Sequence, residues 1–246
     1  ILIFFLLYKE GMQFHHNFRR VGLSGIIGGV GLAFAFIFFI FGMTFTSAAT
    51  TLFMIGTQPL FAGLFAYIFL REFVKSATVV ACFISLFGMF LMAYNDWYAG
   101  TLLGWLFGLL CSIGFSIFAV SLRWRPDTPK FTTIIIAGLT CALFSVFMII
   151  LTGDDYSMPL RNILLSMLHG TFVATGLICL SIGARYLPAA EFMLLSLLEV
   201  VGGVLWCWIP IFGINEVPST VTMFGGVAII FSIAYHAIGT RQRSAV

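Results

Sequence analysis

Residues 21–70, VGLSGIIGGVGLAFAFIFFIFGMTFTSAATTLFMIGTQPLFAGLFAYIFL, contain no charged side chain. A single α-helix over this stretch would be about 75 Å long at ~1.5 Å per residue. The hydrocarbon core of a bilayer is only about 30 Å thick. We therefore expect two membrane-spanning helices, separated near 43–46, where hydroxyl residues cluster after Gly42. This stretch predicts a chain that crosses a membrane more than once.

The composition of the whole chain agrees with this prediction. Of its 246 residues, 61% are hydrophobic and 9% are charged, and the mean hydropathy is +1.11. Soluble domains contain about 25% charged residues. A cytosolic enzyme, a secreted disulfide scaffold and a nucleic-acid-binding protein are therefore excluded. The five cysteines lie in apolar stretches without the spacing of metal ligands, so we predict no metal and no cofactor.

Polar residues divide the rest of the chain into further apolar segments. The predicted spans are 21–42, 47–70, 76–94, 100–122, 131–152, 163–183, 188–212 and 219–239. The apolar segment Ile1–Tyr8 is too short to span a membrane, and it lacks the flanking features of a signal peptide. We interpret it as the end of a helix whose start is missing. The fold class predicted is therefore an all-α polytopic membrane protein with about eight full helices plus a stub.

The distribution of basic residues predicts the orientation. Alternate loops, beginning with 9–20 and including the C-terminal tail, contain eleven lysines and arginines, whereas the intervening loops contain only Arg161. Basic loops lie on the cytoplasmic side of membrane proteins. We therefore expect a multi-pass protein of the cell (inner) membrane with its C-terminus in the cytoplasm. One missed helix would destroy this alternation.

An internal repeat is visible when the chain is shifted by 141 residues, which places 42–68 on 183–209. Gly42 then meets Gly183, and Gln58 meets Glu199. In both copies a short break precedes a long helix, an acidic loop and a Gly-containing helix. The two long helices begin on opposite sides of the membrane, which indicates inverted-topology repeats. Many secondary transporters have this architecture, with their sites near the midplane between the repeats.

Several motifs resemble a known family. They are Thr46-Ser-Ala-Ala-Thr50, Gln58-Pro-Leu-Phe-Ala62 and Phe69-Leu-Arg-Glu72 in the first copy, and Pro188-Ala-Ala-Glu191 and Leu198-Glu-Val200 in the second. Together they resemble the drug/metabolite transporter superfamily, in its EamA-like branch. The sequence departs from the family pattern at Val200, where a proline is usual, and at Asn215, where a glycine is usual.

The resemblance implies an inverted-repeat bundle of ten helices, five plus five, with both termini cytoplasmic. Residues 1–94 would form a first repeat lacking its N-terminal helix and most of the second, and residues 100–240 would form the second repeat. The implied activity is export or exchange of small metabolites, which include amino acids, amines and drugs.

Glu199 and Glu191 are the only acidic residues inside predicted spans. A charge at the bilayer centre costs roughly 2.5–3.5 kcal/mol on insertion scales. Glu199 lies about 17 Å along its predicted helix, close to the midplane. This position favours a role as a substrate ligand or as a proton-coupling carboxyl. Helix packing is the alternative. Glu191 lies near the cytoplasmic interface, where pairing with Arg185 is the alternative to a site role.

The first copy offers a matching polar set. Gln58 is level with Glu199, Thr50 corresponds to Glu191, and Thr57 adds a hydroxyl beside Gln58. We expect these groups to face a central cavity, with interhelical hydrogen bonding as the alternative.

Four further residues are candidates. His169 lies inside a span and is a potential proton relay to Glu199. Trp105 is a potential aromatic surface for a cationic substrate. Glu72 and Glu216 end the loops after the two long helices. A gate contact and an ion pair that fixes the loop are the two alternative interpretations of each residue.

One face of span 100–122 carries a small residue at every fourth position. These residues are Gly100, Gly104, Gly108, Ser112 and Ser116. Small residues allow close helix packing.

These observations favour a secondary transporter that works by alternating access and is not an enzyme. Its partners would be a small-molecule substrate and the lipid bilayer, without nucleic acid, while proton coupling and a homodimer stay open. An intramembrane enzyme is one alternative, for which Asp154, Asp155 and Arg161 form the only candidate cluster. A channel or partner subunit is the other.

Overall fold

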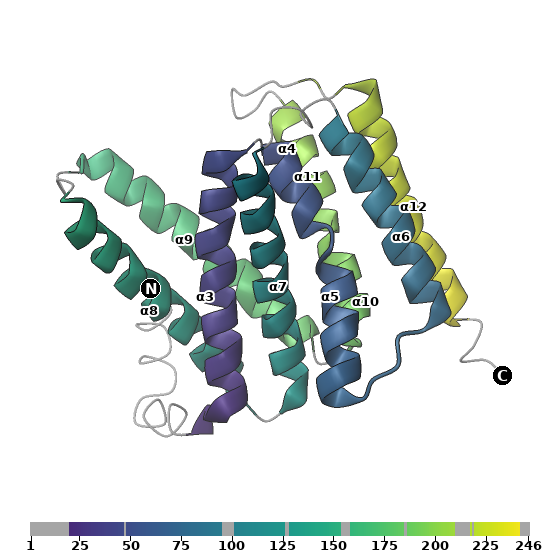
Figure 1. The fold of residues 1–246 in the computed structure, drawn as a ribbon, viewed down its shortest axis with the longest axis horizontal. Coiled ribbons are helices and arrows are strands. Elements are labelled where there is room, and N and C mark those ends of the chain that lie inside the picture. Colours follow the sequence, from purple (N-terminus) through teal and green to yellow (C-terminus); the bar gives the residue numbers. More distant parts are fainter. Residues whose placement is uncertain are drawn as a thin grey trace.

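The computed structural model describes residues 20–46, 48–94, 101–125, 128–153, 158–184, 186–209, 217 and 219–241. The regular structure in these ranges is helical, and the helices stand side by side as a bundle (Figure 1). They are α3 (Gly22–Phe45), α4 (Ala48–Ile55), α5 (Gln58–Phe65), the π-helix η1 (Ala66–Leu70), α6 (Ser76–Ala93), α7 (Leu102–Trp124), α8 (Lys130–Thr152), α9 (Leu160–Gly183), α10 (Ala189–Ser196), α11 (Leu198–Trp208) and α12 (Thr220–Arg241).

The predicted spans correspond to helical segments whose ends differ from the prediction by a few residues. Within the described ranges, seven helices are long and apolar enough to cross a bilayer, with Thr50–Leu70 counted as one. The eighth predicted span, 188–212, contains α10 and α11 in succession. The stub 1–8 lies outside the described residues. The predicted polytopic helical bundle is therefore confirmed.

Glycines bring α3 and α7 into backbone contact. A Cβ atom added at Gly114 of α7 would lie 2.6 Å from the carbonyl oxygen of Gly31 and 2.9 Å from the amide nitrogen of Ala35, both on α3. Such distances leave no room for a side chain. Because lipid tails are as apolar as leucine, close backbone approach and van der Waals packing hold helices together in a membrane.

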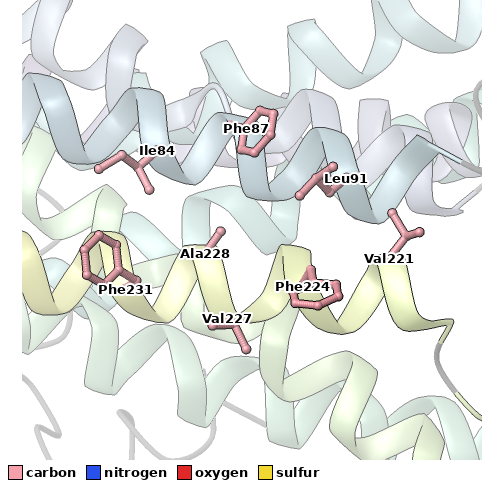
Figure 2. A pocket seen from close by; sticks show the side chains of 8 residues that line it. All are labelled: Ile84, Phe87, Leu91, Val221, Phe224, Val227, Ala228 and Phe231. Carbon is pink, nitrogen blue, oxygen red and sulfur yellow. The ribbon is translucent and has the colours of Figure 1, made fainter.

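The helices α6 and α12 pack in the same way. A Cβ at Gly88 of α6 would lie 2.7 Å from the carbonyl oxygen of Gly225 on α12. On their outer side the pair forms an open groove (Figure 2). Its lining is apolar throughout: Ile84, Phe87, Leu91, Val221, Phe224, Val227, Ala228 and Phe231. The groove therefore suits lipid chains and offers no polar group to a substrate.

Two spans that the sequence predicts as continuous helices are interrupted. The first breaks at Gly56–Thr57, between α4 and α5, and the second at Leu197, between α10 and α11. Pro59 contributes to the first break because proline has no amide hydrogen to donate. The second break occurs without a proline. Val200 stands at the position where the EamA-like family usually has one. This is a correction to the predicted helices.

The two interrupted helices lie against each other in opposite directions (Figure 1). Ala62 and Ala66 at the end of the first share a buried cluster with Phe192 and Met193 of α10. A second cluster contains residues that flank both breaks. These are Leu52, Phe53 and Leu60 for the first break and Leu194, Leu197 and Val200 for the second. The tertiary structure thus brings the two breaks together inside the bundle.

Candidate substrate and coupling site

Hydroxyl groups of α7 hold the first helix break. The hydroxyl of Thr57 donates to the carbonyl oxygen of Met54 (2.6 Å) and lies 2.7 Å from the hydroxyl of Ser112. Because Thr57 has a single hydroxyl proton, Ser112 is the donor of the second bond. The hydroxyl of Ser116 lies within hydrogen-bond distance of two backbone carbonyl oxygens, that of Gln58 (3.0 Å) and that of Ser112 (2.8 Å), and shares its single proton between them. Carbonyl groups at the break are thereby satisfied, as a membrane interior requires.

Ser112 and Ser116 have a role that the sequence interpretation missed. Both were expected to be part of a small-residue packing face, and the structure confirms that face at Gly104 and Gly108, whose added Cβ atoms would meet Thr46 and Met54. The same four-residue spacing places the two serine hydroxyls at the break. The sequence contained a signal for this role, because the small-residue pattern of this span changes from glycine to serine at the level of the bilayer centre.

Gln58 is buried, with 2% of its surface exposed. Its side-chain amide nitrogen has no hydrogen-bond partner within the described part of the chain. Buried donors are normally paired, and leaving one unpaired costs free energy.

Glu199 lies in the first turn of α11, directly after the second break. Its side chain is exposed, and it forms no ion pair with any residue that the structure describes. Its carboxylate lies within electrostatic range of Cys111 on α7, the residue before Ser112. The Glu199 charge is thus on the side of α7 that holds the first break. The two helix breaks beside which Glu199, Thr57 and Gln58 lie share one buried cluster.

Glu191 is buried in the first turn of α10 and is ion-paired. One carboxylate oxygen lies 3.3 Å from the Nζ atom of Lys75, and the other lies 3.6 Å from the Nε2 atom of His236. The alternative partner Arg185 is outside the described residues. Lys75 and His236 were not identified as site residues, because they are distant in sequence and only the packing of α6 and α12 against α10 brings them close.

Glu72 forms the second charged contact at this end of the bundle. Arg123 of α7 donates to it through Nε (3.0 Å) and Nη2 (2.5 Å), and its Nη1 donates to the carbonyl oxygen of Leu187 (2.7 Å). Arg123 therefore joins the loop after η1 to the segment that leads into α10. The other predicted loop residue, Glu216, lies outside the described residues.

The remaining candidates lie on α4, α7 and α9. Thr50 is fully buried on α4, and Trp105 is partly buried on α7. His169 is exposed on α9, a helix on which Ser181 is the buried residue. No hydrogen bond or ion pair between His169 and Glu199 is found in the ranges described, so the proton relay stays a prediction.

Comparison with known proteins identifies the type of protein. Residues 1–94 match the model of the EamA-like transporter family. The matched part is therefore similar to EamA-like transporters. A crystal structure, described only as that of a protein, matches with a TM-score of 0.71 and 20% identity, and the match covers 89% of this chain and 80% of the other. That likeness concerns the fold alone. No curated protein is a significant match.

The contacts of Arg123 lead to a prediction. Arg123→Lys should lower the apparent unfolding temperature in detergent, because a lysine ammonium cannot reproduce the planar guanidinium, which donates twice to Oε1 of Glu72 and once to the carbonyl oxygen of Leu187. We expect a loss of about 1–2 kcal/mol. Thermal unfolding of the purified variant measures it, with Arg125→Lys as the matched control, since no ion pair of Arg125 is found in the described ranges. Equal unfolding temperatures for the two variants would contradict the assignment.

Proposed function

We propose that this chain is an EamA-like secondary transporter that exports or exchanges small molecules bearing an ammonium group, meaning amine-bearing metabolites, amino acids or drugs. The Glu199 carboxylate at the second helix break, which forms no ion pair with any described residue, carries the proposal. A charge within a membrane span requires a partner. Among α3, α4, α5, α6, α7, α10 and α11, the basic residue is Arg123 at the end of α7, and it is engaged by Glu72 and Leu187. A substrate ammonium group supplies the missing charge.

The neighbouring polar groups suit a substrate with a polar head. The unpaired amide of Gln58 donates to an oxygen of the substrate, while Glu199 binds the ammonium group. Thr57 is already engaged with Met54 and Ser112, so its role is to maintain the break. An amine with a nearby carbonyl or carboxylate, as in an amino acid, uses both groups.

The arrangement of the two interrupted helices supports alternating access. The bounds of α4, 48 and 55, differ from those of α10, 189 and 196, by 141 residues at both ends. This is the shift that aligns the two sequence copies. We therefore propose that residues 1–94 and 100–240 are inverted repeats that rock about the two breaks. On this proposal, the end of the bundle with Lys75 and Arg123 faces the cytoplasm of a cell whose inner membrane holds the protein.

Uptake into inverted membrane vesicles tests the proposed function. Vesicles containing the protein receive a panel of radiolabelled amines, cationic drugs and amino acids. We expect saturable accumulation of at least one cationic compound and competition among related amines. Vesicles from cells lacking the protein provide the background. Uptake that is linear with concentration would favour a channel. Chemical conversion of the compound would favour an intramembrane enzyme, and no accumulation of any cation would contradict the proposal.

A further inference from the structure

The cluster of Lys75, Glu191 and His236 lies apart from the helix breaks. Glu191 is in the first turn of α10, Lys75 immediately precedes α6, and His236 is on the last part of α12. The Glu191 and His236 side chains are 8% and 7% exposed, whereas Lys75 is 46% exposed. One carboxylate therefore ties three separate elements together.

We infer that Lys75, Glu191 and His236 form a proton-binding site that controls how tightly α10 is held against α6 and α12. The inference rests on the proposed function only in giving this site a role in the transport cycle. Histidine is the side chain whose charge ordinarily changes between pH 5 and 8. Uptake of a proton from water makes the imidazole a cation beside the second oxygen of Glu191 and adds one positive charge to the cluster. The contact between α10 and α12 then tightens.

Among the described residues, the helices packed against α10 and α12 carry two other charged side chains, Arg123 on α7 and Glu199 on α11. Helix α10 packs against α5, α7 and α6. The residues of α5 and α6 include no charged side chain, and the charge that α7 contributes is Arg123, which is engaged by Glu72 and Leu187. Glu199 lies beyond the break at Leu197, so the ionisable groups within the cluster are Lys75, Glu191 and His236.

The cluster is connected mechanically to the candidate substrate site. Helix α10 runs from Glu191 to the break at Leu197, two residues before Glu199. Two ion pairs hold the segment 71–75. Arg123 binds Glu72 near its start, and Glu191 binds Lys75 at its end. Tightening or releasing Glu191 thus changes the restraint on α10 at one end while Glu199 binds substrate near the other.

Hydrogen–deuterium exchange of the purified protein in lipid nanodiscs tests the inference without any substrate. After correction for the intrinsic effect of pH on exchange, we expect amides in 71–75 and 189–193 to be roughly fivefold better protected at pH 6 than at pH 8, the factor typical of one charge pair. His236→Gln should remove this pH effect. His236→Lys should keep the protection high at both pH values. Glu199→Gln, as the control, should leave the effect intact.

Two results would overturn the inference. One is a wild-type protein whose corrected protection does not differ between pH 6 and pH 8. The other is a pH effect that persists in His236→Gln; if that variant does not fold, persistence in Glu191→Gln has the same meaning. Because no substrate is present, these results are independent of the vesicle uptake experiment. A pH effect without uptake of any cation would contradict the proposed function and leave the proton site standing.

Discussion

Glu199→Gln is expected to reduce uptake of organic cations at least tenfold at an unchanged amount of protein in the membrane. Glutamine has nearly the same size as glutamate and keeps a hydrogen-bonding head, but it carries no charge. A hydrogen bond to a charged group contributes about 1.5–3 kcal/mol, and each 1.4 kcal/mol corresponds to a factor of about ten in affinity. Since Glu199 has no ion pair among the described residues, the loss should fall on substrate binding and not on folding.

Initial rates of uptake into vesicles at several substrate concentrations measure this effect. Glu199→Asp is the matched variant, because it keeps the charge and moves it by one methylene group. We expect this variant to retain uptake with a higher KM. Equal uptake by the wild type and Glu199→Gln would assign Glu199 to helix packing, and loss of uptake in both variants together with a lower unfolding temperature would do the same.

Gly114→Ala is expected to destabilise the protein by about 1–3 kcal/mol, the range measured for overpacked sites. The added methyl group would meet backbone atoms of Gly31 and Ala35 on α3 at 2.6 and 2.9 Å. Backbone atoms cannot rotate away as a flexible side chain does, so α3 and α7 would have to separate along their contact. In an unrestrained helix the same change is favourable by about 1 kcal/mol, because alanine has the higher helix propensity.

Gly138→Ala provides the control for this prediction. Gly138 lies within α8, and an added Cβ would meet no atom within 4 Å. We expect the unfolding temperature in detergent to rise slightly or stay unchanged for Gly138→Ala and to fall by several degrees for Gly114→Ala. The same change for both variants would show that the contact between α3 and α7 does not limit stability.

Much of the candidate site was predictable because its chemistry is rare in a membrane. The chain has only two acidic residues within its predicted spans. Glu199 and Glu191 were identified because placing a charge inside a membrane costs free energy. The repeat then indicated Gln58 as the partner position of Glu199. The partners of Glu191 were not predictable. Lys75 and His236 are 116 and 45 residues away in sequence, and no pattern along the chain relates them to α10.

The sequence by itself determined that this protein crosses the membrane repeatedly, where its spans lie, and that it resembles the EamA-like transporters. These properties follow from local quantities, namely hydropathy over about 20 residues and short motifs. Only the tertiary structure decided that the two long helices are broken at Gly56–Thr57 and Leu197, that serines of α7 hold the first break, and that Glu191 binds Lys75 and His236. The physical reason is that each of these features depends on a neighbouring helix, which supplies the hydrogen bond, the opposite charge or the packed surface that the local sequence lacks.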